Sequence, residues 1–271
     1  MAGTVAAPMT TLECQRVCRD FGGLRAVGNF SLTVAVGELV GLIGPNGAGK
    51  TTAFNVITGV YPASDGAVLM DGRRIDGHAP AQINRAGIAR TFQNIRLFGN
   101  LTVLENVTVG FHRSHGLLST ILRSSKFNAE RAEAEKDGLE LLRTLGLAEK
   151  AHQLSRNLPY GDQRRLEIAR ALATGPKILL LDEPAAGMNP QEKIELMELI
   201  RFIRDRFRLG ILLIEHDMKL VMSICERIVV LDHGETIAVG TPAEIQNDPR
   251  VIEAYLGESA ESPLESELPQ S

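Results

Sequence analysis

A glycine-rich turn between an aliphatic run and a helical run constrains the fold of this chain more than any other feature. The turn reads Gly44-Pro45-Asn46-Gly47-Ala48-Gly49-Lys50-Thr51 and is followed by Thr52. Glycine reaches backbone conformations closed to other residues, so consecutive N–H groups in such a turn can point inward and bind phosphate oxygens. Lys50 adds a charge that reaches the β- and γ-phosphates, and Thr51 offers a hydroxyl to Mg²⁺. We therefore predict a phosphate-binding loop for a nucleoside triphosphate.

The residues on either side of the turn suit such a loop. Residues 38–43 are mostly aliphatic and predict a buried strand, and residues 52–57 predict the first turns of a helix. The N-terminus of a helix favours anions. We expect a strand, the loop and a helix in that order, with the phosphates at the start of the helix.

Composition limits the classes of protein that remain. The chain has 271 residues, 44% of them apolar, and a net charge of −4, which fits a globular protein of one large domain or one and a half. The lack of a basic excess argues against nucleic acid as a partner. The cysteines, Cys14, Cys18 and Cys225, lack metal-type spacing and are expected to be reduced thiols. Because no apolar run approaches ~20 residues, we expect any membrane role to come through partner subunits.

The first part of the chain predicts an antiparallel sheet. After a loose lead-in at residues 1–11, alternating apolar and polar residues predict strands at 12–18, 27–36, 67–71 and 88–93, with a short helix near 82–86. Such alternation is typical of a sheet with one solvated face. We therefore expect these strands to pair with one another.

Residues 94–158 predict a helical segment inserted between the strands. Thr102 and Glu105 have the spacing of a capping box, and residues 129–145 predict a surface helix. Residues 111–128 predict an insertion, where His112 and His115 favour a solvated loop over a metal site because no cysteine or carboxylate cluster accompanies them.

The second half of the chain predicts a parallel sheet. Aliphatic runs at residues 178–181, 211–214 and 228–231 alternate with helical patterns at 191–208 and 218–225, and residues 234–239 and 249–256 close the fold. Near-continuous aliphatic runs of this kind are typical of parallel strands that are covered by helices on both faces. Residues 258–271 are acidic and rich in Ser and Pro, and we expect a disordered tail.

Two carboxylates end the aliphatic run Lys177-Ile178-Leu179-Leu180-Leu181-Asp182-Glu183. An isolated Asp-Glu pair at a strand end is equally a plain helix cap. Beside a phosphate loop, however, Asp182 can hold Mg²⁺ through water, and Glu183 can polarise the attacking water. General-base assistance of that kind is worth ~10²–10⁴-fold in rate.

The segment Leu158-Pro159-Tyr160-Gly161-Asp162-Gln163-Arg164-Arg165-Leu166-Glu167-Ile168-Ala169-Arg170 resembles the signature helix of ABC-type ATPases. The other motifs of that family follow in order: Phe21, the phosphate loop, Gln93, Asp182-Glu183, the loop Ala186-Gly187-Met188-Asn189-Pro190, and His216. The resemblance implies an α/β P-loop NTPase (RecA-like) core with an N-terminal antiparallel β subdomain and an inserted α-helical subdomain. It covers residues 12–257 as a single ATPase domain.

The same resemblance implies roles for single residues. Gln93 would sense the γ-phosphate and Mg²⁺, His216 would bind the γ-phosphate, and Phe21 would stack on adenine. The signature residues Tyr160, Gly161 and Asp162 would close on the phosphate of an opposing subunit.

A finer resemblance, to the ATP-binding subunit of branched-chain amino acid importers (the LivG type), is carried by three further stretches. They are Arg90-Thr91-Phe92-Gln93-Asn94-Ile95-Arg96-Leu97-Phe98, Glu183-Pro184-Ala185-Ala186-Gly187-Met188-Asn189-Pro190 and Val251-Ile252-Glu253-Ala254-Tyr255-Leu256-Gly257. It implies ATP and Mg²⁺ as cofactors and a peripheral position on the cytoplasmic face of the membrane. The implied partners are two permease subunits, a sister ATPase and an extracytoplasmic binding protein.

Other functions stay open. The ATPase of a lipopolysaccharide exporter shares the arginine-rich signature helix. ABC-type ATPases of DNA repair or translation usually carry two nucleotide units or long coiled-coil insertions, and this sequence predicts neither. A non-catalytic regulator is disfavoured because Lys50, Glu183 and His216 are all present.

Two residues depart from the pattern of the superfamily. Pro159 stands where the signature usually has Ser, and Asn189 stands where the loop after the catalytic strand usually ends in Asp. Proline suits the first position of a helix, so we expect Pro159 to begin the signature helix. It cannot donate a hydroxyl to an opposing phosphate, which predicts a weaker site and unequal sister subunits.

Overall fold

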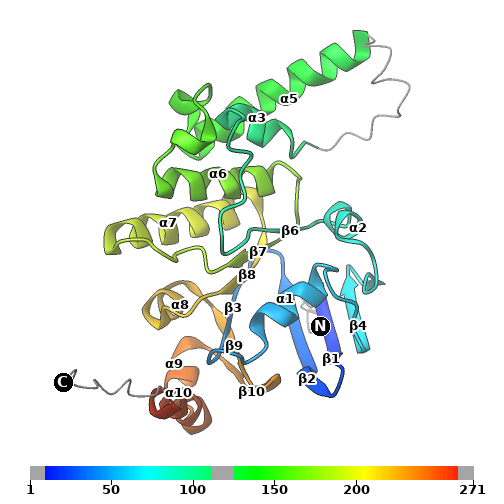
Figure 1. Ribbon diagram of the computed structural model, residues 1–271, viewed down its shortest axis with the longest axis vertical. Coiled ribbons are helices and arrows are strands. Elements are labelled where there is room, and N and C mark those ends of the chain that lie inside the picture. The colour runs from blue at the N-terminus through cyan, green and yellow to red at the C-terminus, as the bar shows by residue number, and fades with distance from the viewer. Residues whose placement is uncertain (1–9, 112–124, 262–271) are drawn as a thin grey trace, which may run out of the picture.

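The computed structural model describes residues 10–111 and 125–261, which form a two-sheet core beneath a helical region (Figure 1). The first sheet is antiparallel, in the order β2-β1-β4-β5. Its long hairpin joins β1 (Thr10–Phe21) to β2 (Leu24–Ala35) through Gly22 and Gly23. The sheet is completed by β4 (Asp65–Met70) and β5 (Arg73–Arg74). The predicted N-terminal antiparallel sheet is present, although β1 begins inside the segment expected to be loose.

The second sheet carries the phosphate loop at its centre. Its order is β10-β9-β3-β8-β7-β6, with parallel pairing from β9 to β6 and an antiparallel edge at β10. Its strands are β3 (Leu39–Ile43), β6 (Ile88–Arg90), β7 (Ile178–Asp182), β8 (Gly210–Ile214), β9 (Arg227–Asp232) and β10 (Glu235–Gly240). Carboxyl ends of parallel strands meet at one edge of a sheet, so the ends of β3, β6 and β7 come together there.

Strand β6 corrects one prediction. Residues 88–93 were expected in the antiparallel sheet, but β6 pairs in parallel with β7 and ends at Arg90. A three-residue strand is too short for its alternation to identify its sheet. Gln93 consequently lies beyond the end of β6, in a loop of residues 91–102 that we call the Gln93 loop.

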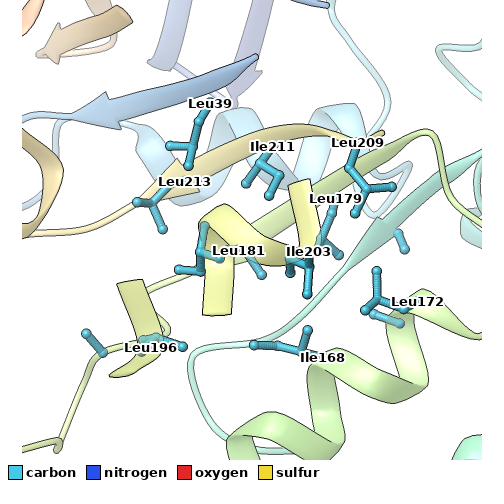
Figure 2. Close-up of a cluster of buried hydrophobic side chains, with 14 of the residues drawn as sticks. Leu39, Ile168, Leu172, Leu179, Leu181, Leu196, Ile203, Leu209, Ile211 and Leu213 are labelled. Carbon is cyan, nitrogen blue, oxygen red and sulfur yellow. The ribbon is translucent and has the colours of Figure 1, made fainter. Parts of the chain in front are cut away.

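The central sheet is buried on both faces. Residues of one parity, such as Leu179, Leu181 and Leu213, pack against α6 (Tyr160–Leu172) and α7 (Pro190–Phe207), as Figure 2 shows. Residues of the other parity, such as Leu180 and Leu212, belong to the cluster that contains Phe30 of β2 and Phe54 of α1 (Lys50–Ile57). The period-two alternation of a strand thus joins the helical layer to the antiparallel sheet.

The helical region lies at the top of the view in Figure 1. It holds α3 (Val103–Thr108), α5 (Ser125–Thr144) and two short 3₁₀ turns, η1 (Ala148–Lys150) and η2 (Ser155–Asn157). The predicted capping box is confirmed, since the Thr102 hydroxyl accepts from Glu105 N and the Glu105 carboxylate accepts from Thr102 N. Helix α5 begins at Ser125, inside the predicted insertion. His112 and His115 lie outside the described residues.

Short helices complete the chain. They are α2 (Pro80–Arg85), α8 (Met218–Ile224), α9 (Pro242–Gln246) and α10 (Pro249–Glu261). Helix α10 continues past residue 258, where a disordered tail was predicted, and residues 262–271 lie outside the described part. In the described ranges, no helix has both the length and the apolar character needed to span a membrane. The division into one domain with an inserted helical part stays a prediction.

Candidate functional site

The phosphate loop takes a shape that two of its glycines make possible. Gly44 has φ 150° and Gly49 has φ 98°. A Cβ atom on Gly44 would lie 2.0 Å from the carbonyl oxygen of Leu231, and one on Gly49 would lie 2.5 Å from that of Ala26. No side chain fits at either position. The loop is therefore pressed against backbone from β2 and β9, which fixes its place at the edge of the sheet.

Lys50 lies against the loop that precedes it. Its Nζ donates to the carbonyl oxygens of Gly44 (2.6 Å) and Pro45 (2.8 Å). Helix α1 begins at Lys50 and has no acidic residue in its first turn. An ammonium group, a glycine-rich loop and an unopposed helix N-terminus together favour a polyanion.

A pocket of about 390 Å³ opens over this loop. Its lining includes the predicted loop residues from Asn46 to Thr52, together with Glu183. It also includes Leu24, Arg25 and Ala26 at the start of β2 and His233 after β9, which the sequence analysis missed. Only the turn at residues 21–23 could have hinted that the start of β2 folds back over the loop. A larger hollow, of about 700 Å³, lies around Gln15, Asn29 and Arg227, away from the predicted site.

Phe21 lies outside the lining of this pocket. It ends β1, and its ring packs edge-on against Tyr61 with the centroids 5.1 Å apart. The guanidinium of Arg19 lies 4.4 Å from the centroid of the same ring. Adenine stacking by Phe21 stays a prediction.

The two carboxylates at the end of β7 occupy different environments. Asp182 is buried and forms an ion pair with Arg90, at 2.6 Å, from the end of β6. The other terminal nitrogen of Arg90 donates to Asn55 Oδ1 at 2.7 Å. Glu183 adopts a left-handed conformation, with φ 44°, and lies in the lining of the pocket. The sequence predicted different roles for the two acids but gave no sign of the ion pair between Arg90 and Asp182.

The three predicted catalytic residues converge. Gln93 Nε2 donates to Glu183 Oε2 at 2.7 Å, and His216 Nδ1 lies 3.7 Å from the same oxygen. They come from three loops, after β6, β7 and β8. The structure thus brings together groups that lie far apart in the sequence, and their roles stay predictions.

Glu215 is a further carboxylate beneath this group, and the sequence analysis missed it. It is almost fully buried, and its Oε1 accepts from Ala185 N at 2.7 Å. Its Oε2 lies 3.9 Å from His216 Nδ1. Burial, reinforced by the negative charge of Glu183, raises the pKa of Glu215. Its place directly before His216 was the only signal in the sequence.

The signature residues lie at the start of α6 rather than around the pocket. Pro159 was expected to begin the helix, but it is the N-cap, one residue before the helix starts at Tyr160, because its ψ of 154° is not helical. The Tyr160 hydroxyl donates to Ala186 O at 2.8 Å, and Asp162 forms an ion pair with Lys150. Gly161 lies between them in the first turn. Asn189, the other departure, caps α7 by accepting from Glu192 N at 3.0 Å.

A model of the family described as "ABC transporter" matches residues 27–186. The chain belongs to the ABC transporter family. A second model, described as "Branched-chain amino acid ATP-binding cassette transporter", matches residues 235–261 of this ABC ATPase.

Relatives of this ABC ATPase cover nearly all of its length. The high-affinity branched-chain amino acid transport ATP-binding protein LivG of Salmonella typhimurium is 52% identical over 88% of this chain and 94% of its own. The lipopolysaccharide export system ATP-binding protein LptB of Escherichia coli is 37% identical over 92% of this chain and 98% of its own. The crystal structure of an ATP-binding cassette of an ABC transporter in its ADP conformation superposes with a TM-score of 0.80. It is 31% identical and covers 92% of this chain and 99% of that one, which confirms the predicted fold class.

Proposed function

We propose that this ABC ATPase binds and hydrolyses ATP to drive a membrane importer of branched-chain amino acids, namely leucine, isoleucine and valine. The match of residues 235–261 to the branched-chain amino acid model carries the proposal. The 52% identity to LivG against 37% to LptB supports import over lipopolysaccharide export.

The loop and the converging side chains suit hydrolysis of the terminal phosphate. The loop N–H groups and Lys50 hold the β- and γ-phosphates. Glu183 accepts the proton of a water whose oxygen bonds to the γ-phosphorus, while the bond from that phosphorus to the bridging oxygen breaks and ADP leaves. Gln93 and His216 orient the carboxylate of Glu183 and the γ-phosphate.

The oxygen donors near the loop fit Mg²⁺ that arrives with the nucleotide. Mg²⁺ is usually bound through one or two carboxylates, substrate phosphates and water. Asp182 supplies one carboxylate, of which Arg90 engages only Oδ2, and Thr51 supplies a hydroxyl. Gln93 adds an amide oxygen when its Nε2 faces Glu183. When bound, the ion neutralises charge on the phosphates.

Substitution of the proposed general base tests the chemistry. Glu183→Gln should keep ATP binding and lose turnover by ~10²–10⁴-fold, because the amide cannot accept the proton. Lys50→Ala should instead lose nucleotide affinity, because it removes a charge from the phosphates. Nucleotide binding and phosphate release are measured on both variants with the partner subunits present. Near-normal hydrolysis by Glu183→Gln would refute the assignment of Glu183.

The helical region offers a surface for the permease subunits. A mainly apolar hollow of about 500 Å³ lies between the Gln93 loop and helices α3 and α6, with Phe92, Phe98 and Val109 in its lining. Phe98 and Val109 are both exposed. We infer that residues 94–158 dock on a cytoplasmic loop of the permease and place this subunit at the membrane.

Cross-linking from single introduced cysteines tests the docking. The native cysteines Cys14, Cys18 and Cys225 are free and buried, so an introduced thiol dominates the reaction. Phe98→Cys should capture the permease, whereas Ile252→Cys on α10, equally exposed, should not. Capture from Ile252→Cys alone would contradict the docking model.

The signature residues need a second ATPase subunit to reach a phosphate. Tyr160, Gly161 and Asp162 lie at the start of α6, away from the pocket of their own chain. We infer that they close on the nucleotide of a sister subunit, identical or related. An extracytoplasmic binding protein would deliver the solute to the permease and contact this subunit only indirectly.

A further inference from the structure

Two opposite charges are buried within helix α6. Arg164 is 0% exposed and Glu167 is 1% exposed, and their ion pair spans 2.7 Å from Nη1 to Oε2. Taking two ions out of water is expensive, and apolar residues of similar volume often stabilise a fold equally well. The stability of α6 alone therefore does not explain the pair.

Four further bonds of the two side chains go to the loop that carries Gln93. Arg164 Nη1 donates to Phe92 O and Nη2 donates to Gln93 O, both at 2.7 Å. Glu167 Oε1 accepts from Phe92 N at 3.4 Å and from Arg96 N at 3.3 Å. Two consecutive carbonyl groups and two N–H groups of this loop are thus held by one helix.

The same helix also reaches the loop on the other side of Glu183. Arg164 Nη2 lies 3.4 Å from the Tyr160 hydroxyl, which donates to Ala186 O at 2.8 Å. Between the two loops, Gln93 Nε2 bonds to Glu183 Oε2. Helix α6 is therefore linked to the segments that carry both partners of this hydrogen bond.

We propose that Arg164 and Glu167 form a buried clamp that makes the Gln93 loop and helix α6 one rigid unit. Arg164 is a positioning residue, because it fixes the backbone of Gln93 so that the side chain reaches Glu183. A guanidinium holds two carbonyl groups in a planar fork, whereas an ammonium group is a point charge without that geometry. This inference rests on the proposed hydrolytic role of Glu183 and Gln93, and adds that displacement of Gln93 is passed to the start of α6.

A clamp and a purely structural pair predict different kinetics. Loss of the clamp misplaces Gln93 but leaves the phosphate loop intact, so kcat falls while the KM for ATP stays constant. Loss of a structural pair lowers the melting temperature and the fraction of active protein without changing kcat per active site.

The experiment uses the assembled transporter, with ATP hydrolysis, solute uptake and melting temperature measured on each variant. Arg164→Lys should lower kcat by about 10-fold or more and change KM by less than about two-fold. The double variant Arg164→Met/Glu167→Leu removes both charges together and should fold, but should not restore kcat. Arg165→Lys is the control, because Arg165 is on the same helix and pairs with Glu195 at the surface.

The proposed clamp predicts how tightly transport is coupled to hydrolysis in each variant. Solute moved per ATP hydrolysed should fall in Arg164→Lys and in the double variant, and stay unchanged in Arg165→Lys. A kcat equal to that of the wild type in the double variant would overturn the proposed clamp. So would an Arg164→Lys variant in which kcat is unchanged and only the melting temperature or the KM is altered. Failure of the wild-type assembly to import branched-chain amino acids would refute the proposed solute, while the split between kcat and KM would still be measurable from hydrolysis.

Discussion

The phosphate loop shares a pocket with Glu183, and the Gln93 loop contacts Glu183 through Gln93, but the two loops are held in opposite ways. The phosphate loop is shaped by backbone: Gly44 and Gly49 lie against the carbonyl groups of Leu231 and Ala26, and Gly234 N donates to Ala48 O at 3.0 Å. Its conformation depends on the absence of side chains.

The Gln93 loop is shaped by side chains from elsewhere. Arg164 and Glu167 hold its first half. Asn106, fully buried in α3, accepts from Phe98 N at 2.9 Å and donates to Phe98 O at 3.1 Å, and the Ser155 hydroxyl donates to the same carbonyl at 2.9 Å. A loop held by glycine sterics has a fixed form, whereas a loop held by remote side chains can move as those side chains move. This difference would suit the proposed roles, with a phosphate loop of fixed form beside a Gln93 loop that moves together with helix α6.

Adding a methyl group to the phosphate loop should have the largest effect. Gly44→Ala should lower the free energy of unfolding by more than about 4 kcal/mol, because the Cβ would meet backbone that cannot yield. Gly47→Ala is the matched variant, since its φ is 78° but its Cβ would meet open space. It should lose only the left-handed penalty of about 1–2 kcal/mol. Denaturant unfolding measures both, and equal losses would show that sterics do not shape the loop.

Removing a side chain of another element that holds the Gln93 loop should have the next largest effect. Asn106→Ala should cost about 2–3 kcal/mol of unfolding free energy, because it leaves Phe98 N without its side-chain partner and removes the bonds of the amide to the carbonyl groups of Phe98, Leu101 and Thr102. Asn100→Ala is the control, because Asn100 accepts from Arg156 at the surface and should lose less than about 0.5 kcal/mol. Nucleotide affinity should stay unchanged in both. A fall in affinity in Asn106→Ala would mean that the two loops are not independent.

A smaller effect is expected where a phosphate loop meets the signature of a sister subunit. Pro159→Ser, in a Glu183→Gln background, should strengthen ATP-dependent association by at most the ~1.5–3 kcal/mol of one bond to a charged group. Pro159 is the N-cap, so the hydroxyl of a serine at this position can also accept from an N–H group in the first turn of its own helix. That bond would reduce the gain in association. ATP titration of subunit association separates the two results. Unchanged or weaker association would show that the Gly161 N–H and the helix start already satisfy the phosphate.

The smallest expected effect is a dependence on pH. Glu215 holds the loop after Glu183 through a side chain, and burial raises its pKa in the folded state. The contribution of Glu215 to the free energy of unfolding is thus complete below the pKa of this group in the unfolded state, and it is lost as pH rises through its pKa in the folded state. The loss is no more than about 1.4 kcal/mol per pH unit. Glu215→Gln should therefore gain stability relative to the wild type as pH rises from about 4. Gly47→Ala should keep the wild-type slope, and parallel curves for all three proteins would contradict the prediction.

The parts of the site that are formed locally could be predicted from the sequence. The phosphate loop, the strand ending in Asp182 and Glu183, and the capping box at Thr102 each depend on neighbours in the chain, and the structure has all three. The overall fold followed from the family motifs and the alternation of strands and helices.

The parts that depend on remote contacts could not be predicted. The pairing of β6 with β7, the ion pair of Arg90 with Asp182 and the contacts of Arg164 with the Gln93 loop all join segments more than seventy residues apart. No local pattern encodes such partners. The end of α10 was missed for another reason, because an acidic, Ser- and Pro-rich composition does not prevent a preceding helix from continuing for one more turn.

Helix α6 begins without a cap from any side chain in the described residues, whereas α3, α7 and α9 each begin with a capping box. A capped N–H group must release its cap before it binds anything else, and an uncapped one need not. The isolated subunit therefore lacks the roughly 1 kcal/mol that a cap would supply at this helix start. If a nucleotide phosphate of a sister subunit accepts from the start of α6 on assembly, as proposed, that stability returns, and folding and assembly are thermodynamically linked at this helix. The melting temperature of the subunit would then report on its state of assembly.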